Sequence, residues 1–318
     1  MAVLHPSPEQ AGASPRRGRP PGRARPGRRT RWRFNSAYLF IAPSLVLIAV
    51  FIAEPILQSG WISLHDYTIG AAHNPWVGFG NYTALWHDSR FWNALRVTAV
   101  YTVAVTIGQV VLGLAIAARL RRTTWYSSLL RTAYFFPYIA SLVVVGVIWK
   151  FLLDPQVGLV NAWLSDLGWS SPPDWLQSTS LALPTVIFVG LWKNVGFTMI
   201  VLLAGMQQVP ADLYEAATLD GAGAWRKFRH VTLPALRPSL LFTTLIATIT
   251  GLQLFDLVFA MTSGGPVFST ESIVMYLYEK GFVEFDMGYA SAIAWVLFVI
   301  ILAVSAVQLR VARYRDDD

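Results

Sequence analysis

Residues 209–238 read VPADLYEAATLDGAGAWRKFRHVTLPALRP, a polar segment that lies between two long apolar stretches. Its chemistry predicts two short helices joined by a turn. Asp212 is the expected N-cap of the first helix, with Glu215 in the capping-box position three residues later. Gly221 is expected at the turn, because glycine adopts a positive φ without a steric penalty. The second helix is amphipathic, and two prolines are expected to end it: Pro234 and Pro238.

Six apolar stretches of the chain are long enough to cross a membrane as helices. A hydrocarbon core of about 30 Å needs roughly 20 mostly apolar residues. The composition agrees, because only 14% of the 318 residues are charged, where a soluble domain carries about 25%. We therefore predict an all-α integral membrane protein with six transmembrane helices. Their approximate ranges are 38–57, 94–114, 134–153, 181–205, 239–261 and 289–309.

Glycine and proline occur inside several of these stretches, among them Pro137, Gly190 and Gly196. Membrane helices tolerate such residues where neighbouring groups satisfy the freed backbone. The prediction of six spans therefore stands in spite of them.

The basic residues predict the topology. Twenty of the 25 Lys and Arg residues lie in the N-terminal arm, in the links after the second and fourth stretches, and at the C-terminal end. The alternate loops, roughly 58–93, 154–180 and 262–288, contain only Arg90 and Lys280. Lys and Arg accumulate in cytoplasmic loops, so we expect a multi-pass protein of the cell's inner membrane with both termini in the cytoplasm. The net charge of +7 belongs to this pattern and does not indicate a nucleic-acid partner.

Residues 1–35 differ from the rest, because they are mostly Arg, Pro, Gly and Ala. Such a composition cannot offset the entropy of ordering, so we expect a disordered basic cytoplasmic tail ahead of a permease-like domain over 36–318. Arg28-Arg29 before an apolar stretch could instead indicate a twin-arginine export signal. No small-residue cleavage site follows, and we predict an uncleaved first span.

Many tryptophans lie in the loops predicted to be outside. They are typical of an aromatic belt at the membrane interface. A contact surface for an external partner that delivers the solute is the alternative interpretation.

The polar segment and its flanks resemble a known family. The stretches that carry the resemblance are Glu215-Ala216-Ala217, Asp220-Gly221-Ala222, Leu233-Pro234 with Pro238, Trp192-Lys193-Asn194-Val195-Gly196-Phe197, Thr262-Ser263-Gly264-Gly265-Pro266 and Val77-Gly78-Phe79-Gly80-Asn81-Tyr82. Together they resemble the "EAA" loop and flanking helices of permeases in binding-protein-dependent ABC importers. The pattern is most similar to the first permease subunit of the maltose, lactose and glycerol-phosphate type.

The resemblance implies a type I ABC importer bundle, with a permease core over 91–311 and a cytoplasmic coupling loop over 207–238. It also implies partners: a second homologous permease, a cytoplasmic ABC ATPase dimer, an extracytoplasmic solute-binding protein and a sugar as solute. Glu215 is expected to contact the ATPase, although plain helix capping remains the alternative for it. The residues implied in coupling are Glu215, Ala216, Ala217, Asp220, Gly221, Leu233 and Pro234.

No motif for catalysis or cofactor binding is present in the sequence. The chain has no G-x-x-x-x-G-K-[ST] phosphate loop, so ATP and Mg²⁺ are expected in the partner ATPase. The chain contains no cysteine, and its five histidines lack metal-ligand spacing. We therefore expect no enzyme activity, no metal and no cofactor bound by this chain.

Polar residues inside the fourth and fifth stretches are candidates for the solute pathway, since polar groups in hydrocarbon usually face protein or water. Thr243, Thr250, Gln253 and Asp256 are predicted to share one side of the fifth helix. Internal packing is an equally strong interpretation for Lys193 and Asp256. The full set of pathway candidates is Lys193, Asn194, Phe197, Thr250, Gln253 and Asp256.

Two other classes of function stay open at this stage. Six spans could form half of an ion-coupled secondary transporter, but no internal repeat is evident and such a protein does not need the EAA loop. A membrane-embedded enzyme is the second alternative, and no catalytic constellation supports it.

Overall fold

The computed structural model describes residues 36–122 and 124–314, and these are almost entirely helical. The chain divides into two compact units, residues 1–52 and 53–318. The predicted tail over residues 1–35 lies outside the described residues. Within the described ranges there is no strand, only two isolated bridges between His65 and Trp76 and between Thr68 and Asp286. The predicted all-helical class is confirmed.

Four helical stretches are individually long and apolar enough to cross a membrane, and two bent helix pairs would raise this number to six. The first stretch, Phe40–Ile62, comprises most of α1, a π-helical turn and α2. In order, the helices concerned are α1 (Ser36–Ile48), α2 (Glu54–Ile62), α4 (Ser89–Arg119), α5 (Trp125–Ile139), α6 (Leu142–Leu152), α8 (Ala182–Gln207), α10 (Ala224–Lys227), α11 (Leu233–Ala235), α12 (Arg237–Leu252) and α15 (Met287–Tyr314); the bent pairs are α5 with α6, and α10–α11 with α12.

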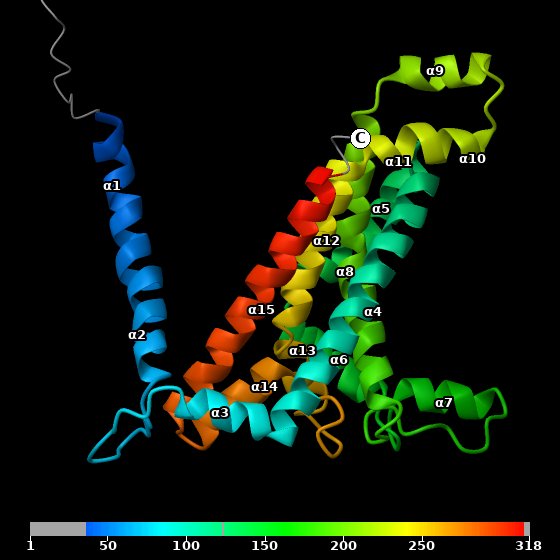
Figure 1. The fold of residues 1–318 in the computed structure, drawn as a ribbon. Coiled ribbons are helices and arrows are strands. Elements are labelled where there is room, and N and C mark those ends of the chain that lie inside the picture. The colour runs from blue at the N-terminus through cyan, green and yellow to red at the C-terminus, as the bar shows by residue number, and fades with distance from the viewer. Residues whose placement is uncertain (1–35, 123, 315–318) are drawn as a thin grey trace, which may run out of the picture. The chain divides into compact units, whose positions relative to one another are not determined.

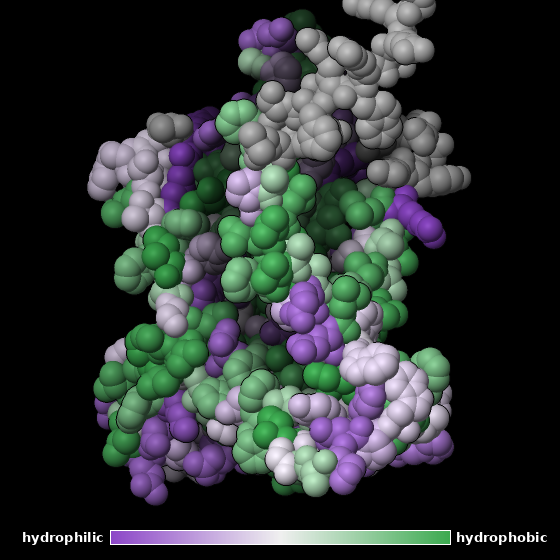
Figure 2. Space-filling view, turned by 90° about the vertical axis from the view of Figure 1, so that its left-hand side faces the viewer, coloured by the Kyte–Doolittle hydropathy of each residue, from purple (hydrophilic) through white to green (hydrophobic). Residues whose placement is uncertain are grey.

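Within the unit 53–318, short helices gather at the two ends of the long ones (Figure 1). The helices of the EAA segment are at one end, where α4 ends and α12 begins. The helices of the loops predicted to be outside are at the other end. On the face in Figure 2, hydrophobic residues predominate in the middle and hydrophilic ones gather below. The short helices are α3 (Gly80–His87), α7 (Leu159–Asp166), α9 (Ala211–Leu219), α10 (Ala224–Lys227), α11 (Leu233–Ala235), α13 (Asp256–Met261) and α14 (Ile273–Tyr278).

The third predicted span is wrong as a straight helix. Helix α5 ends at Ile139 and α6 begins at Leu142, with an angle of 99° between them. The stretch 134–153 therefore straddles a bend. Ala140 and Ser141 are extended there, three residues after Pro137, which removes a backbone donor near the end of α5.

The fifth predicted span is also interrupted. Helix α12 ends at Leu252, and α13 starts at Asp256. Phe255 between them has φ −141° and ψ −64°, which is not helical. Pro234 and Pro238 are also placed differently from the prediction, because they lie in the first turns of α11 and α12 and so begin helices instead of ending one.

Helix α8 runs without a break through its glycines, which serve close helix packing instead. A methyl group at Gly196 would lie 2.0 Å from the backbone oxygen of Tyr134 in α5. A methyl at Gly190 would lie 2.1 Å from the Tyr101 hydroxyl oxygen of α4. Small residues let membrane helices approach this closely, so α8 is held against both α4 and α5.

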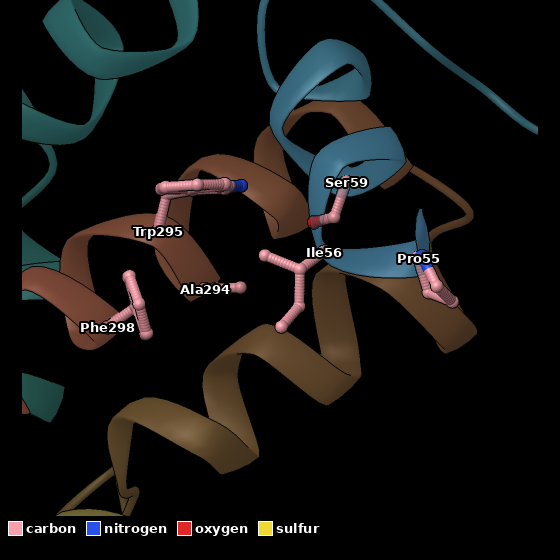
Figure 3. Close-up of a pocket in the computed structure, with 6 residues that line it drawn as sticks. All are labelled: Pro55, Ile56, Ser59, Ala294, Trp295 and Phe298. Carbon is pink, nitrogen blue, oxygen red and sulfur yellow. The ribbon is translucent and has the colours of Figure 1, made fainter. Parts of the chain in front are cut away.

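Helix α2 packs on α15, where a methyl group at Gly60 would lie 2.9 Å from the Trp295 ring. Beside this contact is a cavity of about 250 Å3, with Ile56 reaching from α2 toward Ala294 (Figure 3). Ser59 is the only lining residue with a polar side chain other than the Trp295 indole. A polar solute would find few partners there, so this cavity is not the candidate site.

Candidate functional site

A second cavity, of about 350 Å3, lies between α4, the α5–α6 bend, α8 and the α12–α13 break. The structure brings together here five of the six residues predicted for the pathway. They are Lys193, Asn194, Thr250, Gln253 and Asp256.

The interrupted fifth span is what presents Gln253 and Asp256 to the cavity. Gln253 follows the last turn of α12, and Asp256 opens α13. The Leu254 carbonyl, freed by the break, accepts a hydrogen bond from Ser272. The prediction that Thr243, Thr250, Gln253 and Asp256 share one face of a continuous helix is therefore wrong. Thr243 does not line the cavity, and its hydroxyl donates to the carbonyls of Ser239 and Leu240.

Lys193 is buried and holds the end of α5. Its Nζ donates to the backbone oxygen of Tyr138 at 3.1 Å and lies 5.2 Å from the centre of that ring. Carbonyls in the last turn of a helix have no partner within the helix, so the ammonium satisfies one of them. Phe197 does not line the cavity, but its ring stacks on Tyr138 with centroids 4.8 Å apart.

The amides of the cavity keep unused hydrogen-bonding capacity. Asn194 donates from Nδ2 to the Gly190 carbonyl at 2.8 Å, which leaves Oδ1 as an acceptor. Gln253 is exposed, and none of the described residues bonds its side chain. The Thr250 hydroxyl, in contrast, donates to the Ile246 carbonyl at 2.8 Å.

Sequence reasoning missed the wall that α4 contributes. Tyr101, Val105 and Gln109 line the cavity at i, i+4 and i+8 of this helix and are all buried. An amide in an otherwise apolar stretch was a usable signal for Gln109. Tyr101 gave no such signal, because tyrosine is also common as a packing residue.

The EAA segment folds as two helices around a left-handed turn, as predicted. Gly221 has φ +70°. The Gly221 amide donates to the Thr218 carbonyl at 3.0 Å and the Ala222 amide to the Ala217 carbonyl at 2.9 Å, which is the Schellman pattern. The predicted capping box is wrong, because Pro210 is the N-cap and no side chain caps the helix.

The exposed side of this segment carries the residues predicted for coupling. Glu215, Ala216 and Asp220 are exposed, and Ala217 is half-buried. A groove of about 470 Å3 runs between α9 and the following helices, lined by Ala216, Ala217 and Asp220 among others. Pro234 is exposed in α11 beside the half-buried Leu233.

The inner side of the segment is anchored to the bundle. The Tyr214 hydroxyl lies 2.9 Å from Thr232 Oγ1, and the Arg121 guanidinium lies 4.1 Å above the Tyr214 ring. These contacts hold α9 to the helical segment that follows it and to the residues just after α4.

At the opposite end, charged residues form a compact network that the sequence did not reveal. Arg90 donates to both carboxylate oxygens of Glu271, at 3.0 and 2.7 Å, and also bonds Glu279. Glu271 is 1% exposed. Burial raises the pKa of the Glu271 carboxyl, and Arg90 opposes this. The network ties the start of α4 to the segment before α15.

Asp88 lies beside this network and accepts hydrogen bonds from the Tyr276 and Tyr289 hydroxyls. Burial alone would raise the pKa of Asp88, but these bonds and the backbone amides of Arg90 and Phe91 hold it below its ordinary value of 3.8. Over the described ranges 36–122 and 124–314, no three His, Asp or Glu side chains are grouped to hold a metal ion.

Residues 109–315 match the family described as "Binding-protein-dependent transport system inner membrane component". The chain belongs to this family. This permease is 34% identical over 283 residues to the trehalose/maltose transport system permease protein MalF of Thermococcus litoralis. The alignment covers 88% of the chain and 94% of that protein. It is 36% identical over 287 residues to the lactose transport system permease protein LacF of Rhizobium radiobacter, covering 88% of the chain and 95% of that protein.

The fold of the permease is also that of a solved structure. A bacterial alginate ABC transporter in complex with an alginate pentasaccharide-bound periplasmic protein contains a chain with TM-score 0.78 and 22% identity. The match covers 87% of the permease and 94% of that chain. The predicted membrane permease fold is thereby confirmed.

Proposed function

We propose that this permease forms the translocation path for a sugar or a related polyol or glycerol-phosphate. The observation that carries the proposal is the 350 Å3 cavity where the α5–α6 bend, the α12–α13 break and α8 meet. It offers amide groups from Asn194 and Gln253 and the aromatic side chains of Tyr138 and Phe255. Hydroxyl-rich solutes require groups that both donate and accept hydrogen bonds. The sugars in the names of the two permease relatives support the same class of solute.

The partners follow from the family and are part of the proposal. An extracytoplasmic binding protein delivers the solute, a second permease completes the path, and a cytoplasmic ATPase dimer binds ATP and Mg²⁺. The permease itself binds no cofactor and lies in the inner membrane with both termini in the cytoplasm. The EAA segment docks on the ATPase through its exposed face, with Glu215 and Asp220 as charged contacts.

The test is uptake by the assembled complex in proteoliposomes. Gln253→Ala and Asn194→Ala are expected to slow sugar uptake roughly tenfold or more, because each leaves a solute hydroxyl without a partner. ATPase docking should be unchanged. Gln156→Ala is the matched control, since this amide is exposed in a loop outside the cavity.

Uptake by both cavity variants at the rate of the Gln156→Ala control would place the path elsewhere. Uptake that needs an ion gradient and no ATP would refute the importer and favour a secondary transporter.

A further inference from the structure

We propose that helix α4 supplies a wall of the cavity that contacts the solute, through the Tyr101 hydroxyl and the Gln109 carboxamide. This inference rests on the proposed function and adds a helix to the path. Both residues line the cavity, and both are at least 95% buried. They are eight residues apart, so they lie two turns apart on one side of the helix.

The side chain of Gln109 is held in place through its amide oxygen alone. Its Oε1 accepts a hydrogen bond from the Thr198 hydroxyl of α8 at 3.3 Å. Nε2 has no partner among the described residues. A carboxamide can make four hydrogen bonds, and polar groups inside a membrane segment are costly when unpaired. Thr198 is thus a positioning residue that fixes the oxygen and leaves the NH2 group for the cavity.

The Tyr101 hydroxyl fits against α8 because the residue opposite it, Gly190, has no side chain. The hydroxyl oxygen would lie 2.1 Å from a methyl group at Gly190. The same Gly190 carries the carbonyl that accepts from Asn194 Nδ2. The hydroxyl therefore lies against α8 one turn from Asn194, which lines the same cavity, and has no hydrogen-bond partner among the described residues.

Packing alone does not account for this arrangement. A phenylalanine at 101 and a methionine at 109 would fill the same volume without burying a hydroxyl and an amide. Thr106, on the same helix, is buried and polar but does not line the cavity. The two groups open to the cavity match a solute with at least two hydroxyls, one accepting from Gln109 and one exchanging a hydrogen bond with Tyr101.

Three variants test this in the assembled complex. Tyr101→Phe removes only the hydroxyl, and Gln109→Met keeps the length of the side chain. Thr106→Val is the matched control, a polar-to-apolar change of nearly equal volume on the same helix. Maltose, trehalose and lactose are the probes, at concentrations that saturate the unmodified binding protein. Uptake should fall roughly tenfold in the first two variants and by less than twofold in the control.

A labelling measurement separates this inference from the choice of solute. The chain has no cysteine, so Gln109→Cys gives a single thiol. A charged methanethiosulfonate should modify it, and should not modify Val103→Cys, which is exposed on α4 but outside the cavity.

If Gln109→Cys is modified but the parent protein takes up none of the saccharides, the proposed sugar solute is refuted and the proposal that α4 lines the cavity is retained. Uptake by Tyr101→Phe and Gln109→Met equal to that of Thr106→Val, or an unmodified Gln109→Cys, would overturn the inference.

Discussion

Gly221 offers the sharpest test of how the EAA segment works. It has φ +70°, and a methyl group added there would meet nothing within 4 Å. The effect of Gly221→Ala is therefore a backbone effect alone. A left-handed conformation costs a residue with a Cβ about 1–2 kcal/mol. At about 1.4 kcal/mol per factor of ten, the equilibrium shifts away from the docking-competent loop by roughly 5- to 30-fold, and the affinity for the ATPase should fall by up to that factor.

The assay is the affinity of the purified ATPase for the permease complex in detergent or nanodiscs. Gly223→Ala is the matched control, because Gly223 has φ −69° and equally open surroundings two residues away. Its affinity should change by less than about twofold. Gly221→Asn should recover part of the loss, since asparagine tolerates the left-handed region. Equal affinities for Gly221→Ala and Gly223→Ala would refute the role assigned to the turn.

Three further predictions concern stability and topology. Arg90→Ala leaves the buried Glu271 carboxylate unpaired and should lower the free energy of unfolding by about 3–5 kcal/mol. The measurement is thermal unfolding in detergent. An Arg90→Lys variant as unstable as Arg90→Ala would show that the lost charge is not the cause. The pKa of Asp88 is lowered on folding, so its contribution to stability is present above about pH 4 and lost as the pH falls further. Asp88→Asn should be less stable than the parent at pH 6 and should lose less stability than the parent between pH 5 and 3. Parallel pH profiles of stability for the two proteins would contradict this. A single cysteine at Gly70 should react with an impermeant maleimide added outside cells and one at Arg226 should not, and the reverse pattern would invert the topology.

Composition and charge were enough to predict an all-helical membrane protein, but not where its helices bend. An apolar run of 20 residues has the same hydropathy whether it is straight or folded back. Pro137 was recognised as a possible breaker, yet the 99° bend comes at Ala140 and Ser141. The break at Gln253 has no proline or glycine at its centre, and the contact from Ser272 to the Leu254 carbonyl that supports it is tertiary.

The turn at Gly221 was predicted because it is local, and the structure gives it φ +70°. The capping box failed because Pro210, with φ −55° and ψ 137°, already begins the helix. The ion pairs of Arg90 join residues about 180 positions apart, so a single sequence could not reveal them. The roles of the cavity residues stay predictions until uptake is measured.

The glycine contacts of α8 have a mechanical consequence. Methyl groups at Gly108 or Gly113 of α4 would come within 2.9 Å of α8 side chains, and Gly196 of α8 lies on the α5 backbone. Tightly packed interiors transmit strain instead of absorbing it, so α4, α5 and α8 form one rigid lever. Only residues 208–210 separate α8 from α9. A displacement applied at α9 would therefore be passed along α8 to the cavity, where the α5–α6 bend and the α12–α13 break are the points left to yield.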